Sequence, residues 1–467
     1  MTQAAPPDEA ISTIDTIVAI STPPGRGGIG IVRLSGIRAL PIALSLLRID
    51  QPPGHAKARF THVLDPDTGS PLDEAIVTFF AAPHSYTAED VVEIATHGSP
   101  VILAHVVRST VALGARLAEP GEFTQRAFLN GRLDLVEAEA VHDLIQASTL
   151  RQARVAASQL EGALSRLIRP AKQKLVELIA AMEAGIDFAE DDVDLLTAEQ
   201  IEKSLREIFE PLAVLAQTYS FGQILRDGFS LAIVGRPNAG KSSLFNALLQ
   251  RSRAIVTAAP GTTRDLVMDE LSLDGIPVRL IDTAGLRVAT DEAEAIGIAK
   301  TREVLADADV VLLVIDATEA VAPEINDLIQ SLHDRALLVA RNKMDLIQPV
   351  DRAPEFEEAS PILSPVIEVS ALSGAGLEDL RSAIVTLITA QKIPGESGLV
   401  TNLRQHDSIT STLKILTQVT NEISAGIPHE VILLDLRQAL NHLDALTGQT
   451  TTEEILQLIF STFCIGK

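Results

Sequence analysis

The chain has 467 residues, 46% of them hydrophobic, and its formal charge of −24 argues against a broad basic surface for nucleic acid. The length predicts two or three domains, no apolar run approaches a membrane span, and the N-terminus lacks the pattern of a secretion signal. A single cysteine excludes an intrachain disulfide framework and suits a reducing cytoplasm, while an aromatic share of 3% without tryptophan disfavours base-stacking platforms.

The first region, from about Asp15 to Glu122, mixes strands with one helix. The strand-like runs are TIVAIST, GIGIVRL, EAIVTFF and DVVEIAT, and we expect a helix near Pro100–Leu113. GRGGIG (Gly25–Gly30) fits the dinucleotide fingerprint G-x-G-x-x-G, which needs a strand before it and a helix after it. Because the strand-like IVRLSG follows, we interpret it as a turn between strands, with a dinucleotide site as the alternative.

The second region, from about Gly121 to Gln223, is rich in Ala, Leu, Glu and Gln and is predicted to be mainly helical. Its acidic run DFAEDDVD (Asp187–Asp194) invites a metal-site interpretation. The run lacks the glycine and the closing glutamate of a calcium loop. We therefore expect a solvated helix end or loop.

Five short motifs then follow in one order, each suited to a different part of a bound guanine nucleotide. The first, GRPNAGKS (Gly235–Ser242), fits G-x-x-x-x-G-K-[ST] and lies between the strand-like FSLAIVG and the helical SSLFNALLQ. Its glycines let backbone N–H groups face the β- and γ-phosphates, Lys241 would contact those phosphates, and the Ser242 hydroxyl would bind Mg²⁺. The others are GTTRD (Gly261–Asp265), DTAG (Asp282–Gly285), NKMD (Asn342–Asp345) and SAL (Ser370–Leu372).

DTAG ends the strand-like run PVRLID. Asp282 would hold the Mg²⁺ shell, and the Gly285 N–H would sense the γ-phosphate. Leu286 follows, where Ras-like GTPases carry a glutamine that orients the attacking water. Because leucine cannot orient water, the domain either hydrolyses GTP slowly or obtains this function from another group.

NKMD predicts specificity for guanine. Asp345 can accept hydrogen bonds from guanine N1–H and the N2 amino group, which adenine does not offer in that geometry. NKMD and SAL both follow apolar runs, as loops at the carboxyl ends of strands should, and SAL can present a backbone N–H to guanine O6. NKxD alone is also typical of a turn that starts a helix, so the interpretation depends on the order of all five motifs.

After the loop IPGESG (Ile393–Gly398) the pattern is helical to Lys467. The final CIGK places Cys464 where a prenylation motif has its cysteine, but the last two residues suit that motif poorly. Among neighbouring phenylalanine and isoleucine residues, burial in the core is the default expectation for a lone cysteine, and a reactive thiol is the alternative.

These patterns predict a multidomain α/β plus α protein. We expect an N-terminal α/β domain over residues 1–122 and a helical domain made from residues 123–227 and 392–467. A Ras-like P-loop GTPase domain over residues 228–391 would be inserted between the two helical segments.

The chain resembles the MnmE (TrmE) family of tRNA-modification GTPases over essentially its whole length from Asp15. The resemblance is carried by TPPGRGGIGIVRLSG, SYTAED, PGEFTQRAFLNGRLDL, the GTPase motifs and the terminal FCIGK. Two details depart from the family pattern: Ala88 replaces the glycine of SYTGED, and Arg132 stands where lysine is common.

This resemblance implies one-carbon chemistry in a homodimer. The N-terminal domain would bind 5-formyl- or methylene-tetrahydrofolate, with arginine and lysine suited to glutamyl carboxylates and an acid suited to pterin N–H donors. The residues implied to contact the folate are Arg33, Glu93, Arg132 and Lys467. Without the resemblance, each would be interpreted as part of an ordinary surface ion pair.

The resemblance also implies a flavin-dependent (FAD) partner, MnmG, in a heterotetramer. Together they would build an aminomethyl-type group on the wobble uridine of tRNA. Cys464 is a candidate participant in the one-carbon transfer, because the FCIGK tail would lie beside the folate site.

Hydrolysis in this family is potassium-assisted as G domains pair across the dimer, so K⁺ would neutralise charge that develops between the β- and γ-phosphates. The implied K⁺ ligands are Asn238, Thr257, Ala259 and Thr262, and the implied Mg²⁺ ligands are Ser242 and Thr263. Glu294 would position the attacking water, although on residues alone it is one of several acids in TDEAEAIG and would be interpreted as solvated.

The residues expected to contact GTP come from all five motifs and the loop before GTTRD. They are Asn238, Ala239, Gly240, Lys241, Ser242, Ser243, Thr257, Ala258, Ala259, Pro260, Gly261, Thr262, Thr263, Asp282, Thr283, Ala284, Gly285, Asn342, Lys343, Met344, Asp345, Ser370, Ala371 and Leu372.

Two functions remain open. One is a GTP hydrolase that drives tRNA modification, acting on tRNA without a membrane. The other is a GTP-dependent regulatory switch in ribosome or RNA assembly that performs no one-carbon chemistry. The N-terminal motifs and the FCIGK tail favour the first.

Overall fold

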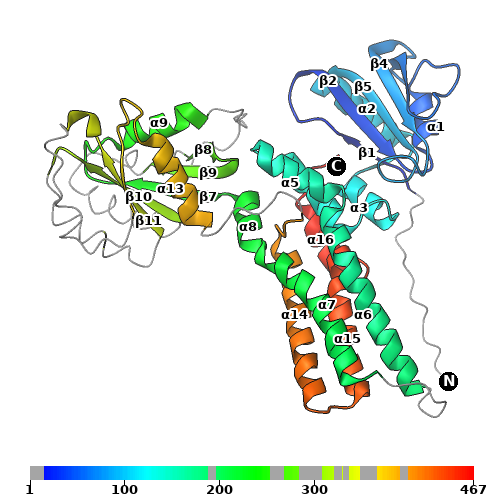
Figure 1. Ribbon diagram of the computed structural model, residues 1–467. Helices are drawn as coiled ribbons and strands as arrows, with labels where there is room; N and C mark the ends of the chain where they lie inside the picture. Colours follow the sequence, from blue (N-terminus) through cyan, green and yellow to red (C-terminus); the bar gives the residue numbers. More distant parts are fainter. Residues whose placement is uncertain are drawn as a thin grey trace, which may run out of the picture. The chain divides into compact units, whose positions relative to one another are not determined.

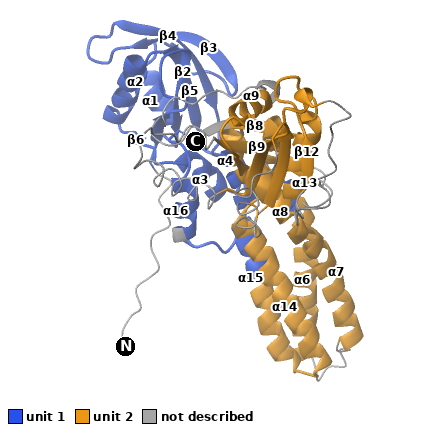
Figure 2. Cartoon of the chain, turned by 90° about the vertical axis from the view of Figure 1, so that its left-hand side faces the viewer, with its two compact units in different colours: residues 1–142, 160–165, 441–467 blue, residues 143–159, 166–440 orange. Residues whose placement is uncertain are grey.

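The computed structural model describes residues 15–187, 196–252, 268–282, 308–319, 329, 336–347, 365–389 and 398–466. The chain divides into two compact units: residues 1–142, 160–165 and 441–467, and residues 143–159 and 166–440 (Figure 2). Among the helices described, none combines the length and the apolar character needed to cross a membrane.

The first unit is built on a six-stranded sheet with the strand order β3-β4-β5-β2-β1-β6 (Figure 1). Neighbouring strands are antiparallel, except that β1 and β6 are parallel. Helices α1 and α2 pack on this sheet, with Leu34, Ile94 and Val106 in the shared core. These elements are β1 (Ile17–Ile20), β2 (Gly27–Ser35), α1 (Ala39–Ser45), β3 (Lys57–Leu64), β4 (Pro71–Phe80), β5 (Val91–Gly98), α2 (Pro100–Ala112) and β6 (Arg116–Leu117).

The end of the chain packs within this same unit. Helix α16 (Glu453–Ser461) lies against α3 (Glu122–Leu129) and α4 (Leu135–Gln146) through an apolar cluster that includes Leu135 and Phe460. Gly121 has a left-handed φ of 69°, and a Cβ there would lie 2.6 Å from the carbonyl oxygen of Phe460. Only glycine permits this close approach of the two segments.

A buried guanidinium joins α3 to the loop between β4 and β5. Arg126 is 6% exposed, and its Nη2 donates to Asp15 Oδ1 at 2.6 Å and to Glu122 Oε1 at 2.9 Å. Its Nη1 donates to Glu89 Oε2 at 3.2 Å. Burial alone would raise the pKa of Glu122, but hydrogen bonds from Arg116, the Glu119 N–H and Arg126 outweigh it, so the pKa is lowered.

The second unit contains a six-stranded sheet with the order β12-β11-β10-β7-β9-β8, parallel except for the β8–β9 pair. Every residue of β7 and β10 is buried, because apolar clusters cover both faces of the sheet. Helices α9 and α13 contribute side chains to one of these apolar clusters. The elements are β7 (Phe229–Val234), α9 (Lys241–Ser252), β8 (Met268–Leu273), β9 (Ile276–Asp282), β10 (Val310–Asp316), β11 (Ala336–Asn342), the 3₁₀ turn η2 (Met344–Leu346), β12 (Val366–Glu368) and α13 (Leu377–Thr389).

Long helices that precede this sheet in the sequence pack against long helices that follow it. Helix α7 contacts α14, Lys174 of α6 pairs with Glu207 of α7, and Arg437 of α15 pairs with Glu183 of α6 at 2.6 Å. The helices are α5 (Leu150–Leu160), α6 (Ala163–Asp187), α7 (Ala198–Gln217), α8 (Tyr219–Asp227), α14 (Leu403–Ser424) and α15 (His429–Thr447).

Most of the predicted elements are confirmed. The strands in the first region, the helix at Pro100, the helical second region and the strands before GRPNAGKS, NKMD and SAL are all present. GRGGIG leads from a turn directly into β2, so the dinucleotide alternative is wrong. Of the acidic run, Asp187 ends α6 and residues 188–194 lie outside the described residues. The proposed domain boundaries stay predictions.

We expect Arg126→Met to destabilise the first unit by about 3–5 kcal/mol at pH 7, because it removes the cation paired with the largely buried Glu89 and one of the two cations paired with Glu122. The lowered pKa of Glu122 makes this stabilisation complete above the ordinary glutamate pKa of 4.5. This stabilisation is lost as the pH falls through the lowered pKa of Glu122. The difference in unfolding free energy between variant and parent should therefore shrink in acid.

Urea unfolding at pH 7 and below pH 4 measures both effects, with the exposed Arg108 changed to Met as the control. Equal losses for the two variants would contradict the role given to Arg126.

Candidate functional site

The loop GRPNAGKS joins the carboxyl end of β7 to the start of α9. Gly235 leaves no room for a side chain, since a Cβ would lie 2.2 Å from the carbonyl oxygen of Val314. Asn238 (φ 66°) and Gly240 (φ 90°) both adopt left-handed backbone conformations. Lys241 Nζ donates to the carbonyl oxygens of Gly235 at 2.8 Å and Arg236 at 2.9 Å, so its ammonium group lies over the loop.

Asn342, the last residue of β11, connects three loops of this site. Its side chain is 1% exposed, and its Nδ2 donates to the Ala239 carbonyl oxygen at 3.0 Å. Its Oδ1 accepts from the Ala371 N–H, also at 3.0 Å. A Cβ on Gly240 would lie 2.2 Å from the same Nδ2. The loops after β7, β11 and β12 are therefore held together at one edge of the sheet.

The rest of NKMD is held by two side-chain contacts. Ser370 Oγ donates to Asp345 Oδ1 at 2.5 Å, which places SAL beside NKMD. Lys343 is left-handed (φ 70°), and its Nζ donates to Asp316 Oδ2 at 2.6 Å. Burial would raise the pKa of Asp316, but hydrogen bonds from Lys343 and Thr318 outweigh it and lower the pKa.

The structure thus brings together the predicted residues 238–243, 342–345 and 370–372, with Ser242 exposed at the start of α9. Asp282 ends β9. The described part of the chain contains no cluster of three or more His, Cys, Asp or Glu side chains suited to a metal ion. The predicted residues that lie outside the described set are Thr257, Ala258, Ala259, Pro260, Gly261, Thr262, Thr263, Thr283, Ala284, Gly285, Leu286, Glu294, Lys467 and the side chain of Asp282.

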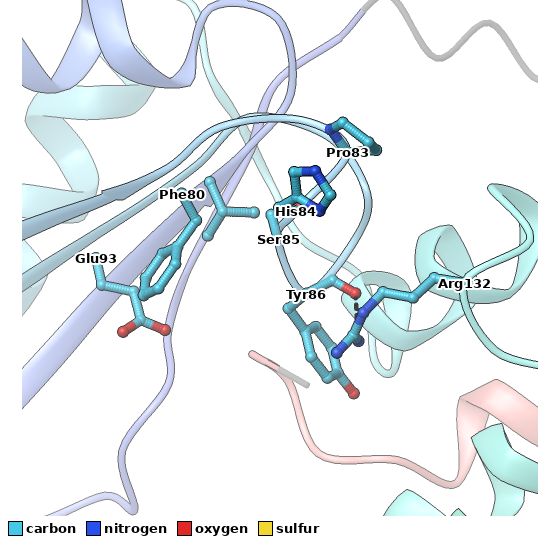
Figure 3. Close-up of a pocket in the computed structure, with 8 residues that line it drawn as sticks. Phe80, Pro83, His84, Ser85, Tyr86, Glu93 and Arg132 are labelled. Carbon is cyan, nitrogen blue, oxygen red and sulfur yellow. Dashed lines mark hydrogen bonds between the residues drawn. The ribbon is translucent and has the colours of Figure 1, made fainter. Parts of the chain in front are cut away.

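A second candidate site lies in the first unit, beside the loop between β4 and β5. It is a cavity of about 450 Å³, within the range typical of small-molecule sites. Figure 3 shows Tyr86 between Glu93 and Arg132 along this cavity. The lining residues are Phe80, Pro83, His84, Ser85, Tyr86, Val91, Glu93 and Arg132.

Arg33 and Glu93 face each other across β2 and β5. The Nε and Nη2 atoms of Arg33 both donate to Glu93 Oε1, at 2.9 and 2.7 Å. Arg33 Nη1 and Ser21 Oγ also donate to the carbonyl oxygen of Gly466, at 3.4 and 3.1 Å. The C-terminal tail is therefore held against the charged pair of the predicted folate site.

Arg132 stacks over the ring of Tyr86, with its Cζ 5.1 Å from the ring centroid, and donates from Nη1 to the Tyr86 carbonyl oxygen at 2.8 Å. Arg33 lies 5.4 Å from the same centroid. Burial raises the pKa of Tyr86, outweighing the hydrogen bond to Thr124 and the two nearby arginines. The phenol is therefore neutral at physiological pH, and both guanidinium groups lie near its ring.

The expected burial of Cys464 is wrong, because its side chain is exposed. Beyond α16, Phe463 enters the apolar cluster, while the Cys464 carbonyl oxygen accepts from the Gly121 N–H at 3.5 Å. Ile465 then pairs with Pro120. The tail is thus held mainly through its backbone, which leaves the thiol outside the core and accessible.

Two residues at these sites were not predicted as site residues from the sequence. Asp316 ends the apolar run VVLLVID, and an acid at the carboxyl end of a buried strand is the one available hint. Tyr86 lies within SYTAED but carries no charge that would single it out as a ligand.

Comparisons with known proteins cover almost the whole chain. Residues 16–132 match the family model described as the GTP-binding protein TrmE N-terminus, and residues 135–464 match the MnmE helical domain. The tRNA modification GTPase MnmE of Koribacter versatilis is 53% identical and covers 97% of this chain and 99% of its own. Proteins with the same name from Aquifex aeolicus (42%; 97% and 100% covered) and Levilactobacillus brevis (41%; 97% and 98%) are also similar.

Ala88 has a left-handed φ of 60°, which explains why glycine suits this position of the loop. We expect Ala88→Gly to stabilise the first unit by roughly 0.5–1 kcal/mol, because relief of left-handed strain exceeds the added freedom of the unfolded chain. Thermal unfolding measures the effect. Ala81→Gly is the control in the same loop, since Ala81 has no positive φ, and it should be neutral or destabilising. A lower melting temperature for Ala88→Gly would contradict the strain argument.

Proposed function

The chain belongs to the MnmE family of tRNA modification GTPases, and we propose that it hydrolyses GTP to drive modification of the tRNA wobble uridine. The observation that carries the proposal is the contact of Asn342 with both Ala239 and Ala371, which joins phosphate-binding and base-binding loops at one sheet edge. Ligands bind at the carboxyl ends of strands in such α/β sheets. The sheet would form a G domain inserted between the two helical segments.

In this proposal each loop contacts a different part of GTP. Backbone N–H groups of the loop at Gly240 would surround the phosphates, and Lys241 would exchange its two carbonyl contacts for phosphate oxygens. Asp345 would accept from guanine N1–H and the N2 amino group. Ser370 supports this role, because its hydrogen bond fixes the Asp345 carboxylate before the base arrives.

Two cations would complete the site. The exposed Ser242 hydroxyl fits Mg²⁺ together with Thr263, since hydroxyl oxygens are ligands that Mg²⁺ accepts beside phosphates. The left-handed Asn238 is exposed and would offer its side-chain oxygen to K⁺, with Thr257, Ala259 and Thr262 as further ligands. When bound, K⁺ would stabilise charge on the phosphates, and Glu294 would position the attacking water in place of the glutamine that Leu286 replaces.

The cavity at Tyr86 is the proposed tetrahydrofolate site, and its donor set fits that group. Both hydrogen bonds from Arg33 end on Glu93 Oε1, so Oε2 can accept from pterin N–H groups. Arg132 is exposed beside the cavity and, with Lys467, suits glutamyl carboxylates. Arg33 would act mainly by fixing Glu93. When bound, a 5-formyl- or methylene-tetrahydrofolate would supply the one-carbon unit.

We further propose that the protein works in the cytoplasm as a homodimer together with an FAD-dependent protein of the MnmG type. The exposed thiol of Cys464 belongs to the tail that Arg33 and Ser21 hold, which supports a role in one-carbon transfer. The complex would act on tRNA. Because this chain has a formal charge of −24, it would contact the tRNA phosphates only through a local patch or through the partner.

Changing Asp345→Asn should weaken GTP and favour xanthosine triphosphate, because the amide donates where the carboxylate accepts. Losing such a bidentate contact costs roughly 1–3 kcal/mol. Titrations of parent and variant with both nucleotides measure the switch, each nucleotide serving as the control for the other. Unchanged GTP affinity would refute the assignment of Asp345.

Cys464→Ser should fold and hydrolyse GTP normally but abolish the modified wobble base in cells, since serine is a much poorer nucleophile of similar size. Nucleoside mass analysis of tRNA gives the outcome. Full modification with the serine variant would show that the thiol takes no part in the chemistry.

A further inference from the structure

We propose that Asp316 is a positioning residue of the guanine-nucleotide site, which acts by holding the side chain of Lys343. The inference rests on the proposed function, because it concerns how the same site reaches its affinity for GTP. Asp316 belongs to none of the five nucleotide motifs and is the last residue of β10.

The two carboxylate oxygens of Asp316 accept hydrogen bonds from different residues. Oδ1 accepts from the Thr318 N–H at 2.9 Å and the Thr318 Oγ1 at 2.7 Å, which fixes the plane of the carboxylate. Oδ2 accepts from Lys343 Nζ at 2.6 Å. The Asp316 side chain is 9% exposed and that of Lys343 is 33% exposed, so the pair is only partly screened by solvent.

Backbone contacts also join the ends of β10 and β11 at Asp316 and Asn342. Asp316 and Asn342 are register partners in β10 and β11, and the Ala317 N–H donates to the Asn342 carbonyl oxygen at 2.9 Å. The left-handed turn at Lys343 immediately follows. Lys343 therefore directly follows Asn342, the residue that contacts the other two loops of the site. Its ammonium group is held by Asp316 at the end of the neighbouring strand, β10.

Because of the position of Lys343, its contact with Asp316 would affect nucleotide binding. Lys343 lies between Asn342, which contacts the phosphate-binding loop, and Asp345, the proposed guanine reader. A free lysine carries about 2 kcal/mol of rotamer entropy, which nucleotide binding would have to remove. Asp316 fixes the side chain beforehand, so that nucleotide binding no longer has to remove this entropy.

Asp309→Asn provides a matched control. Asp309 immediately precedes the same strand, β10, and its Oδ2 accepts from Ser230 N at 2.8 Å and Ser230 Oγ at 2.7 Å. It is more exposed than Asp316, but it too ties β10 to a neighbouring strand. It lies at the end of the sheet opposite the nucleotide loops, so its loss should affect folding alone.

The test measures steady-state GTP hydrolysis and GDP affinity for the full chain and for D316N, D309N, K343M and the D316N/K343M double variant. We expect D316N to raise the KM for GTP and the Kd for GDP roughly tenfold or more, with kcat changed less than about twofold. D309N should leave all three within about twofold. The double variant should bind no worse than K343M, because the two residues act as one unit.

The outcomes are decisive in each direction. Parent-like KM and Kd in D316N, or equal losses in D316N and D309N, would overturn the proposal, as would additive losses in the double variant. If D316N unfolds, K343M carries the test, since it removes the same pair from its exposed side, and parent-like affinity in K343M would overturn the proposal. A parent protein that binds no GTP would instead refute the proposed function itself, and this inference with it.

Discussion

The nucleotide site depends on one buried side-chain amide. Asn342 must both donate and accept inside the protein, and it meets both requirements with backbone groups of Ala239 and Ala371. An unsatisfied buried amide costs about 1–3 kcal/mol, so the two loops are strongly favoured in this arrangement. The absence of a Cβ at Gly240 makes room for the contact. The loops at Ala239 and Ala371 are thus held together by protein contacts of Asn342.

A comparable constraint organises the cavity of the first unit. Arg33 contacts Glu93 from the neighbouring strand and the carbonyl oxygen of Gly466 from the chain's end, while Arg126 fixes the loop that carries Tyr86. Residues more than 400 positions apart in the sequence are therefore joined by one guanidinium. The tail that the charged pair holds carries an exposed thiol. The apolar neighbours of Cys464 did not indicate this exposure, whereas the family resemblance had implied that the tail lies beside this cavity.

The sequence predicted elements well where local patterns dominate. Buried parallel strands such as β7 and β10 are continuous apolar runs, and glycine-rich loops follow them. Strand β3 was not identified, because its first four residues are all exposed and show no alternation. Cys464 was wrongly expected in the core, since its apolar neighbours gave no sign that Phe460 and Phe463 enter the cluster while Cys464 stays exposed. Asp316 acts through a long-range contact that spacing cannot encode.

The central claim is that the nucleotide site and the Tyr86 cavity serve one reaction on tRNA. Mass analysis of wobble uridines in cells that lack this chain, and in the same cells supplied with the parent or with Glu93→Gln, tests it most directly. The account predicts that the modified base disappears without the chain, returns with the parent and stays absent with the variant. An unchanged wobble base in cells without the chain, or full modification with Glu93→Gln, would contradict it.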